Sequence, residues 1–242
     1  MTVIDLPRTL LAADEPLAFT IESRPARWPA LLVCDHASNQ IPRALADLGV
    51  PESALQQHIA WDIGAADLVR ALGARLDLTT VLAGYSRLVI DCNRHLEDPS
   101  SIVAESDAIT VPGNRALTPA QRDARARAIF WPYHRAIDQQ LADIQSARGV
   151  PALIAVHSFT PKMHGAFRPW HCGILWDRDP RLAVPLMQGL RRETDLVVGD
   201  NEPYSGRHPA DYTVDVHAEN RGWPHVCIEI RQDLYGDRKS VV

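Results

Sequence analysis

Several features that mark other classes of protein are absent from this sequence. Lysine occurs only at Lys162 and Lys239, and the net charge is -5 with a pI of about 6.0. An acidic chain without basic clusters has no positively charged surface to bind a phosphate backbone, so we expect no nucleic-acid partner. No apolar stretch approaches the ~18 residues of a membrane span. The N-terminal segment has acidic residues and a proline where a signal peptide needs a basic start and an apolar core.

Paired cysteines and the common nucleotide and nucleophile motifs are also missing. The four cysteines are far apart, no CxxC pair occurs, and a cysteine zinc site or redox pair is therefore not supported. Three of them, Cys34, Cys92 and Cys227, lie in apolar runs and are typical of small buried hydrophobic residues. These cysteines indicate a reducing, cytoplasmic location. The absence of G-x-S-x-G, G-x-G-x-x-G and P-loop patterns removes support for a serine hydrolase elbow and for dinucleotide or ATP binding.

What the sequence does contain is a regular alternation of apolar runs and helical patterns. The apolar runs at 30–34, 80–82, 88–91, 152–156 and 226–230 predict strands that are buried on both faces. Helices are predicted at 65–76, from 118 to about 148 with a kink near Pro132, and at 179–190. Strands that alternate with helices indicate an α/β fold with a mixed, mostly parallel sheet between helical layers.

A chain of this length and composition can form one α/β domain. Hydrophobic residues make up 46% and charged residues 23% of the 242 residues, the usual shares for a globular protein. No repeat or internal linker is visible, so we predict a single domain over residues 1–242. The polar, turn-rich stretch 95–117 is long for a connection, which is typical of a lid or a disordered loop.

Ionisable residues interrupt the apolar runs near their carboxyl ends. His36 follows the first run and His157 the fourth, and each precedes a small residue. Ligands bind beyond the carboxyl ends of parallel strands, so these side chains are expected to converge. Two histidines and a carboxylate are ligands that catalytic Zn²⁺ favours, and Asp62 at the start of the helix 65–76 is the predicted third ligand. Two alternatives stay open: Asn39 or Asp35 as third ligand, and histidines that only cap strands by hydrogen bonds.

Glu229 lies in a strongly apolar run, where an ionised carboxylate is costly unless a cation is near. We interpret it as a general base that deprotonates a water molecule held by the metal. The competing interpretation is a structural ion pair of Glu229 with Arg231 or Arg94. In that case, His217 would be the substitute base.

Arginines flank these motifs and indicate an anionic substrate, because guanidinium binds carboxylate in a bidentate fork. Arg87 or Arg94 is expected to hold a substrate carboxylate, and one of them to stabilise the oxyanion. We place Arg94 with Glu229 in the catalytic set. The predicted substrate contacts are Arg87, Asn93, Arg168 and His217.

These residues lie in segments that resemble the N-formylglutamate amidohydrolase family. The segments span nearly the whole chain in order: CDHASNQIP (34–42), HIAWDIGA (58–65), YSRLVIDCNR (85–94), VPGN (111–114), WPYH (131–134), VHSFTP (156–161), GDNEPYSG (199–206), YTVDVHAENRG (212–222) and IEIRQDL (228–234). The resemblance implies deformylation of N-formylglutamate.

More distantly, the chain is similar to zinc carboxypeptidases, which implies a phosphorylase/hydrolase-like three-layer α/β/α sandwich. Asn93-Arg94 would then be the pair that binds the substrate carboxylate, His157 a zinc ligand and Glu229 the catalytic glutamate. The carboxypeptidase H-x-x-E motif is not matched, because Asn39 stands three residues after His36. A similarity to zinc N-acetylmuramoyl-L-alanine amidases implies instead that the carboxylate ligand is Asp62.

Taken together, these patterns predict a zinc-dependent amidohydrolase that acts on the N-acyl amide of a small acidic amino-acid derivative such as N-formylglutamate. Two alternatives are a zinc carboxypeptidase or peptide amidase on the same site, and a metal-binding or ligand-binding module without turnover. The predicted cofactor is Zn²⁺ and the predicted partner is a small N-acyl amino acid. The patterns leave the acyl group and the oligomeric state open.

Overall fold

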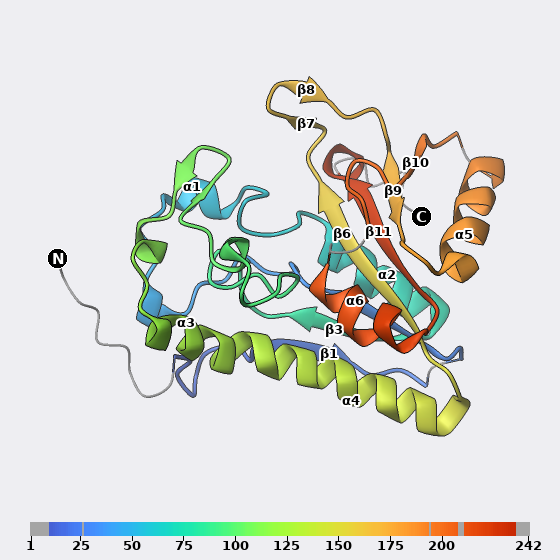
Figure 1. Ribbon diagram of the computed structural model, residues 1–242, viewed down its shortest axis with the longest axis horizontal. Coiled ribbons are helices and arrows are strands. Elements are labelled where there is room, and N and C mark those ends of the chain that lie inside the picture. Colours follow the sequence, from blue (N-terminus) through green and yellow to red (C-terminus); the bar gives the residue numbers. More distant parts are fainter. Residues whose placement is uncertain (1–9, 26, 194, 208–210, 236–242) are drawn as a thin grey trace.

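The computed structural model describes residues 10–235, apart from 26, 194 and 208–210. Its centre is a seven-stranded sheet in the order β1-β3-β2-β6-β11-β9-β10 (Figure 1). The strands are β1 (Phe19–Glu22), β2 (Ala30–Cys34), β3 (Thr79–Ala83), β6 (Ala152–Phe159), β9 (Cys172–Leu175), β10 (Val198–Asp200) and β11 (His225–Arg231). Neighbours are parallel except at β1-β3 and β11-β9, which are antiparallel. The prediction of a mixed, mostly parallel sheet is confirmed.

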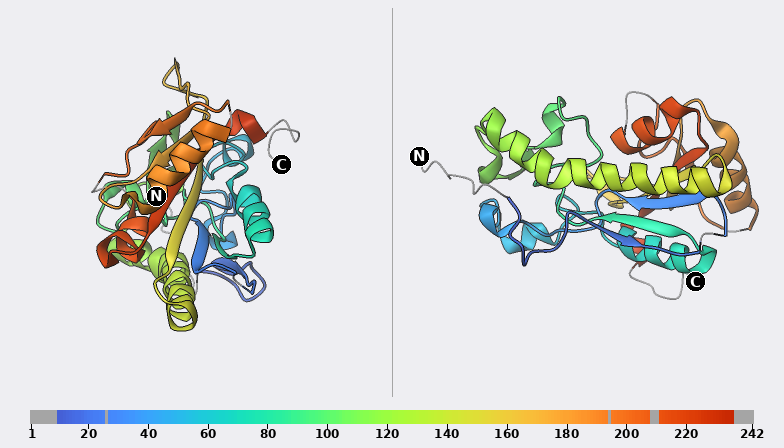
Figure 2. Two further views of the ribbon diagram at one scale, coloured as in Figure 1. Left: turned by 90° about the vertical axis from the view of Figure 1, so that its right-hand side faces the viewer. Right: turned by 90° about the horizontal axis from the view of Figure 1, so that it is seen from below.

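Helices cover both faces of this sheet (Figure 2). On one face, α2 (Ala65–Leu76) packs Val69 among side chains of β2 and β3, and α5 (Pro180–Glu193) packs Met187 against β9, β10 and β11. On the other face lie α4 (Trp131–Arg148), with Ile137 in the main core, and α6 (Tyr212–His217), with Val214 in the same core. The fold is therefore the predicted three-layer α/β/α sandwich. Among the described residues, no helix is both long enough and apolar enough to cross a bilayer.

The remaining elements are short and lie mostly in the connections. They are η1 (Arg43–Leu45), α1 (Glu52–Leu55), η2 (Pro99–Ser101), β4 (Glu105–Ser106), β5 (Ile109–Thr110), η3 (Pro112–Asn114), β7 (Lys162–Met163), β8 (Ala166–Phe167), η5 (Glu219–Arg221) and η6 (Gln232–Tyr235). The stretch 95–117 thus forms two helical turns and the small hairpin β4-β5, so it is a structured connection.

The long helix predicted from residue 118 is present, with a π-helical turn in it. It begins at α3 (Pro119–Arg125), where Thr118 and Gln121 form the predicted capping box. The π-helical turn η4 (Ala126–Phe130) then leads into α4, which has Pro132 in its first turn. Proline has no backbone N–H to donate. The π-helical turn beside Pro132 changes the hydrogen-bond pattern and accommodates the missing hydrogen bond.

The predicted strand at 88–91 is wrong. These residues are buried, but they form turns, with Val89 donating its amide to Ser86 and Asp91 donating its amide to Ser101. Side chains from later in the chain replace strand neighbours: Asn114 donates to the carbonyl of Leu88, and Arg125 donates to the carbonyl of Val89. A buried backbone needs hydrogen-bond partners, and here they come from polar side chains.

Arg125 generates the first testable prediction. It is 1% exposed, and its guanidinium donates to Val89 O, Asn114 Oδ1 and Gly113 O, with burial lowering its pKa to about 10. Arg125→Met would leave these three acceptors without their donor, so we expect the free energy of unfolding to fall by about 2–5 kcal/mol. Urea denaturation measures this change.

The matched control is Arg127→Met, two residues further along the same helical stretch. Arg127 is two-thirds exposed and pairs with Asp123 on the surface. Its loss should change stability by about 0.5 kcal/mol or less. Equal effects of the two substitutions would contradict the assigned role of Arg125.

Candidate metal and catalytic site

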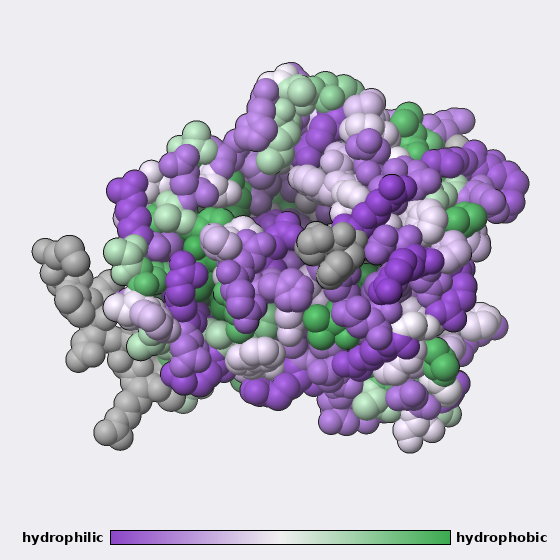
Figure 3. Space-filling model, viewed as in Figure 1, coloured by the Kyte–Doolittle hydropathy of each residue, from purple (hydrophilic) through white to green (hydrophobic). Residues whose placement is uncertain are grey.

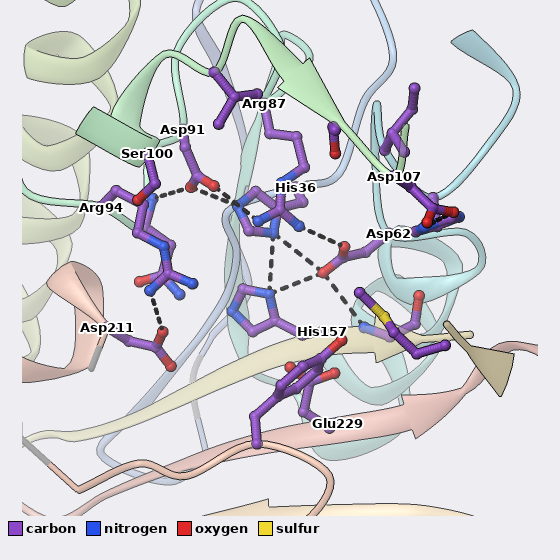
Figure 4. Close-up of a pocket in the computed structure, with 18 of the residues that line it drawn as sticks. His36, Asp62, Arg87, Asp91, Arg94, Ser100, Asp107, His157, Asp211 and Glu229 are labelled. Atoms are coloured by element: carbon purple, nitrogen blue, oxygen red, sulfur yellow. Dashed lines mark hydrogen bonds and ion pairs between the residues drawn. The ribbon is translucent and has the colours of Figure 1, made fainter. Parts of the chain in front are cut away.

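Three buried side chains from separate elements meet beyond the carboxyl end of β2. His36 follows β2, His157 lies in β6, and Asp62 lies in the turn before α2. His36 Nδ1 and His157 Nδ1 are 3.2 Å apart, and Asp62 Oδ2 lies 3.2 Å from the first and 2.8 Å from the second. Figure 4 shows the three side chains pointing at one another. The side chains that the sequence singled out as ligands are therefore brought together.

The outer nitrogens of both rings face further carboxylates. His36 Nε2 is 2.7 Å from Asp91 Oδ1, and His157 Nε2 is 3.2 Å from Asp35 Oδ2. If a metal ion takes the two Nδ1 lone pairs, each neutral ring carries its proton on Nε2, which faces Asp91 in one ring and Asp35 in the other. The two Nδ1 lone pairs and the Asp62 oxygen then face one point, an arrangement that repels itself unless a cation occupies it.

The donor set fits a divalent metal ion. Ligands about 2.0–2.1 Å from a tetrahedral Zn²⁺ are separated by about 3.3 Å, close to the three separations observed here. Carboxylates that accept from the far nitrogen of a ligating histidine are the usual support of such sites. His36, Asp62 and His157 could therefore hold a metal ion. Asn39 instead donates to Leu55 O, and Asp35 faces the outer nitrogen of His157, which removes both alternative third ligands from this point.

The charged groups of the cluster shift one another's pKa values. Burial alone would lower the pKa of His157, but Asp35 and Asp62 outweigh it and raise that pKa well above its usual range. Burial alone would raise the pKa of Asp91, but His36 and Arg87 hold it well below its usual range. Without a metal, protons therefore stay on the histidines, and a metal ion would bind by displacing them.

Glu229 lies beside the cluster on β11, in register with His157 on β6. It is 7% exposed, and its Oε2 has no hydrogen-bond partner. Burial raises its pKa to about 8. A divalent cation nearby would favour the charged form and lower that pKa again. An unpartnered buried carboxylate next to a candidate metal site is the arrangement that a general base requires.

These groups line one cavity of about 690 Å³. Hydrophilic residues gather in the hollow on this face of the molecule (Figure 3). Arg87 reaches it with Nη2 2.8 Å from Asp91 Oδ2 and Nη1 3.5 Å from Asp62 Oδ1, while Arg94 lies 3.4 Å from Asp211 (Figure 4). Asn93 also lines it, and its Oδ1 accepts from the amide of Thr213. The cavity thus combines a candidate metal site, a candidate base and two cations.

Comparison with known proteins agrees with this geometry. The sequence matches the family model for N-formylglutamate amidohydrolase over residues 28–236. The chain belongs to the N-formylglutamate amidohydrolase family. This is a family of enzymes that hydrolyse amides.

Two solved structures are similar to this member of the amidohydrolase family. Gene product Atu2144 from Agrobacterium tumefaciens has 37% identity and a TM-score of 0.91, over 96% of this chain and 92% of that chain. N-formylglutamate amidohydrolase from Ralstonia eutropha JMP134 has 20% identity and a TM-score of 0.72, over 93% and 92%. The second likeness concerns the fold alone. A comparison with curated proteins gave no match.

Two predicted substrate contacts lie outside this amidohydrolase cavity. Arg168 donates to Thr160 and to the Tyr204 hydroxyl, and it is not among the lining residues. His217 is buried between His134 and Asp138. Both are therefore left out of the site. Arg231 bonds Asp233 and the backbone carbonyls of 168–170, so no Glu229–Arg231 ion pair is found among the described residues.

Other residues of the site were given no role from the sequence. Asp91 supports His36, Asp211 pairs with Arg94, and Thr213 donates its hydroxyl to Asp35. Asp91 had a visible signal, since it ends an apolar run. Asp211 and Thr213 had none, because they begin a short helix whose position against the sheet depends on contacts far along the chain. The stretch 95–117 contributes Asp98, Ser100, Val103, Ser106 and Asp107 to the lining.

The second testable prediction separates the ligand from its supports. Asp62→Ala removes an atom that faces both Nδ1 nitrogens, so we expect Zn²⁺ affinity to fall by far more than 100-fold. Asp91→Asn keeps the three candidate ligands and removes the negative charge beside His36 and Arg87, and the loss of such a supporting partner costs about 10–100-fold. Chelator competition on the purified proteins measures both. Asn39→Ala is the control and should keep wild-type affinity, and a large loss there would contradict this ligand set.

Proposed function

We propose that this protein is a Zn²⁺-dependent amidohydrolase that cleaves the N-acyl amide of a small acidic amino acid, with N-formylglutamate as the first candidate substrate. The observation that carries the proposal is the meeting of His36, Asp62 and His157 directly beside Glu229, whose buried Oε2 has no hydrogen-bond partner among the described residues. Family membership supports the reaction type, and the two arginines in the cavity support an anionic substrate. The four free, buried cysteines support a cytoplasmic location.

The proposed chemistry is addition of water to the amide carbon followed by breakage of the carbon–nitrogen bond. A Zn²⁺ ion held by His36, Asp62 and His157 would polarise the carbonyl and lower the pKa of water. Glu229 takes a proton from the attacking water and delivers it to the leaving nitrogen. The products are the free amino acid and a carboxylate, which is formate when the acyl group is formyl.

The two arginines are assigned by their neighbours. Arg87 contacts Asp62 and Asp91, so its guanidinium lies next to the ligand cluster, where an oxyanion develops. Arg94 pairs with Asp211 and lies beside Asn93 in the cavity lining. We assign Asn93 and Arg94 to the binding of the substrate carboxylate. The sequence left open which arginine holds the carboxylate, and this assignment agrees with the role that the carboxypeptidase similarity implied for Asn93-Arg94.

The third testable prediction concerns Glu229→Gln. This change keeps the shape of the side chain and removes the base, so turnover should fall by roughly 10²–10⁴-fold, the usual share of general acid–base catalysis. Bound zinc and the unfolding temperature should stay close to wild type. Release of amine from N-formylglutamate, assayed together with zinc content, is the measurement. Unchanged activity per folded molecule would show that Glu229 is structural.

The fourth prediction tests the substrate class. Arg94→Ala should raise KM for N-formylglutamate by about 10–100-fold, the range expected for a lost hydrogen bond to a charged group. An analogue whose carboxylates are capped as amides should be hydrolysed equally by both proteins. Arg70→Ala, which removes an exposed arginine paired with Glu22, is the control. If peptides with free C-termini prove the better substrates, the peptidase alternative is favoured.

A further inference from the structure

A second set of buried histidines lies behind the cavity. His134 Nε2 is 2.8 Å from the carbonyl of Cys92, and its Nδ1 is 2.9 Å from His217 Nε2. His217 Nδ1 in turn is 2.9 Å from Asp138 Oδ1. Both rings are almost inaccessible, at 2% and 1% exposure, whereas Asp138 is half-exposed. A continuous chain of hydrogen bonds therefore runs from the surface of α4 to the backbone of the site.

The acceptors at the two ends of this hydrogen-bond chain fix the number of protons that it holds. A carbonyl and a carboxylate can only accept, so the two rings must supply the proton of every bond in the chain. Two neutral imidazoles carry one N–H each, which leaves one of the three bonds without a proton. The pair therefore carries one additional proton, and it is a single cation whichever ring holds the middle hydrogen.

The hydrogen-bond partners place that charge on His217, because His217 is the ring that faces the carboxylate of Asp138. Burial, with His217 adjacent, lowers the pKa of His134 to about 3, so His134 is the neutral ring. Burial alone would raise the pKa of Asp138, but His217 and Arg221 hold it at about 2. Arg221 is itself bonded to Asp138, Asp35 is a nearby anion that acts on His134, and the rings of Phe130 and Tyr212 lie against the pair. His217 is thus the ring next to the anion.

The neutral end of the chain fixes a segment that the site depends on. The carbonyl of Cys92 lies between Asp91, which accepts from His36 and Arg87, and Asn93, which lines the cavity. A donor held rigidly against this carbonyl fixes the backbone on both sides of it. Movement here would turn Asp91 away from His36, whose other nitrogen faces the candidate metal position.

The charged end fixes α6, which carries the remaining supports. His217 is the last residue of α6, and Thr213 in the same helix donates to Asp35, the partner of His157. The amides of Tyr212 and Thr213 donate to the backbone and side chain of Asn93. The His134–His217 pair therefore joins α4, α6 and the segment 91–93 into one unit behind the cavity.

We propose that His134 and His217 are positioning residues, a singly charged pair that holds Asp91 and Asp35 where the two candidate histidine ligands need them. Only the expected effects on catalysis rest on the proposed function. The protonation state and the metal affinity that it implies are measurable without a substrate.

The first experiment reads the protons directly. The full chain is labelled with ¹⁵N-histidine, and the ring nitrogens are observed by NMR near neutral pH, with His217→Gln and His134→Gln used for assignment. We expect His217 with protons on both nitrogens and His134 with a proton on Nε2 alone. A neutral His217, with one unprotonated nitrogen, overturns the proposal. This outcome is independent of whether the protein cleaves N-formylglutamate.

The second experiment tests positioning with matched variants. His134→Phe keeps an aromatic ring among Phe130, Tyr133 and Tyr212 but removes both hydrogen bonds. His134→Gln keeps an N–H that can reach the carbonyl of Cys92. We expect zinc affinity and kcat/KM of His134→Phe to fall by about 3–30-fold, the size typical of coupling through a network. His134→Gln should recover most of the loss.

His225→Phe controls for the loss of any buried histidine. His225 is as buried as His217, and its Nδ1 hydrogen-bonds the carbonyl of Trp223 while its Nε2 lies 2.9 Å from Glu219, away from the cavity. It should lose stability with zinc affinity per folded molecule unchanged. Should His134→Phe not fold, Asp138→Asn on the surface of α4 carries the test, with the same expected fall in zinc affinity. Wild-type affinity in every folded variant overturns the proposal, whereas zinc binding without amide cleavage overturns only the proposed function.

Discussion

The site depends on one electrostatic constraint, the meeting of lone pairs from two imidazole rings and a carboxylate at a buried point. Asp91 accepts from the far side of His36, and Asp35 lies 3.2 Å from the far nitrogen of His157, while the near nitrogens face each other 3.2 Å apart with Asp62 beside them. Such an arrangement is stable only with protons or a metal ion at its centre. The positions of Arg87, of Glu229 and of α6 follow from the need to balance the charge around it.

The sequence predicted which candidate ligands lie together because their positions follow from local rules. A histidine directly after or near the end of a buried parallel strand must lie at the carboxyl edge of the sheet, and an acidic residue before a helix can turn towards the same edge. His36, His157 and Asp62 obey these rules, and Glu229 shares the edge through its register with His157. The α/β class and the four parallel central strands rest on equally local patterns.

The errors arise where long-range contacts override local pattern. Residues 88–91 are as apolar as a strand, but Asn114 and Arg125 satisfy their backbone from elsewhere in the chain, so no sheet neighbour is needed. The strands β1, β9 and β10 are short, and nothing local distinguishes them from connections. Arg168 and His217 were assigned to substrate by residue type, and the structure places the first against Thr160 and the second against His134, outside the cavity lining, so their contact with substrate stays a prediction.

A buried polar site of this kind lowers the free energy of unfolding of the protein. Asp35, His36, Asp62, Asp91, His157 and Glu229 are all below a tenth exposed, and each charge removed from water costs free energy that its partners offset only with good geometry. A metal ion that binds the folded state alone restores part of this stability by mass action. Before it binds, the histidines carry protons in its place, and hydrogen bonds from outside the cavity help to hold the rings and their carboxylate partners in position. The hydrogen bonds of α6 and of the Cys92 carbonyl supply that order, which explains why polar groups are buried so far behind the reacting atoms.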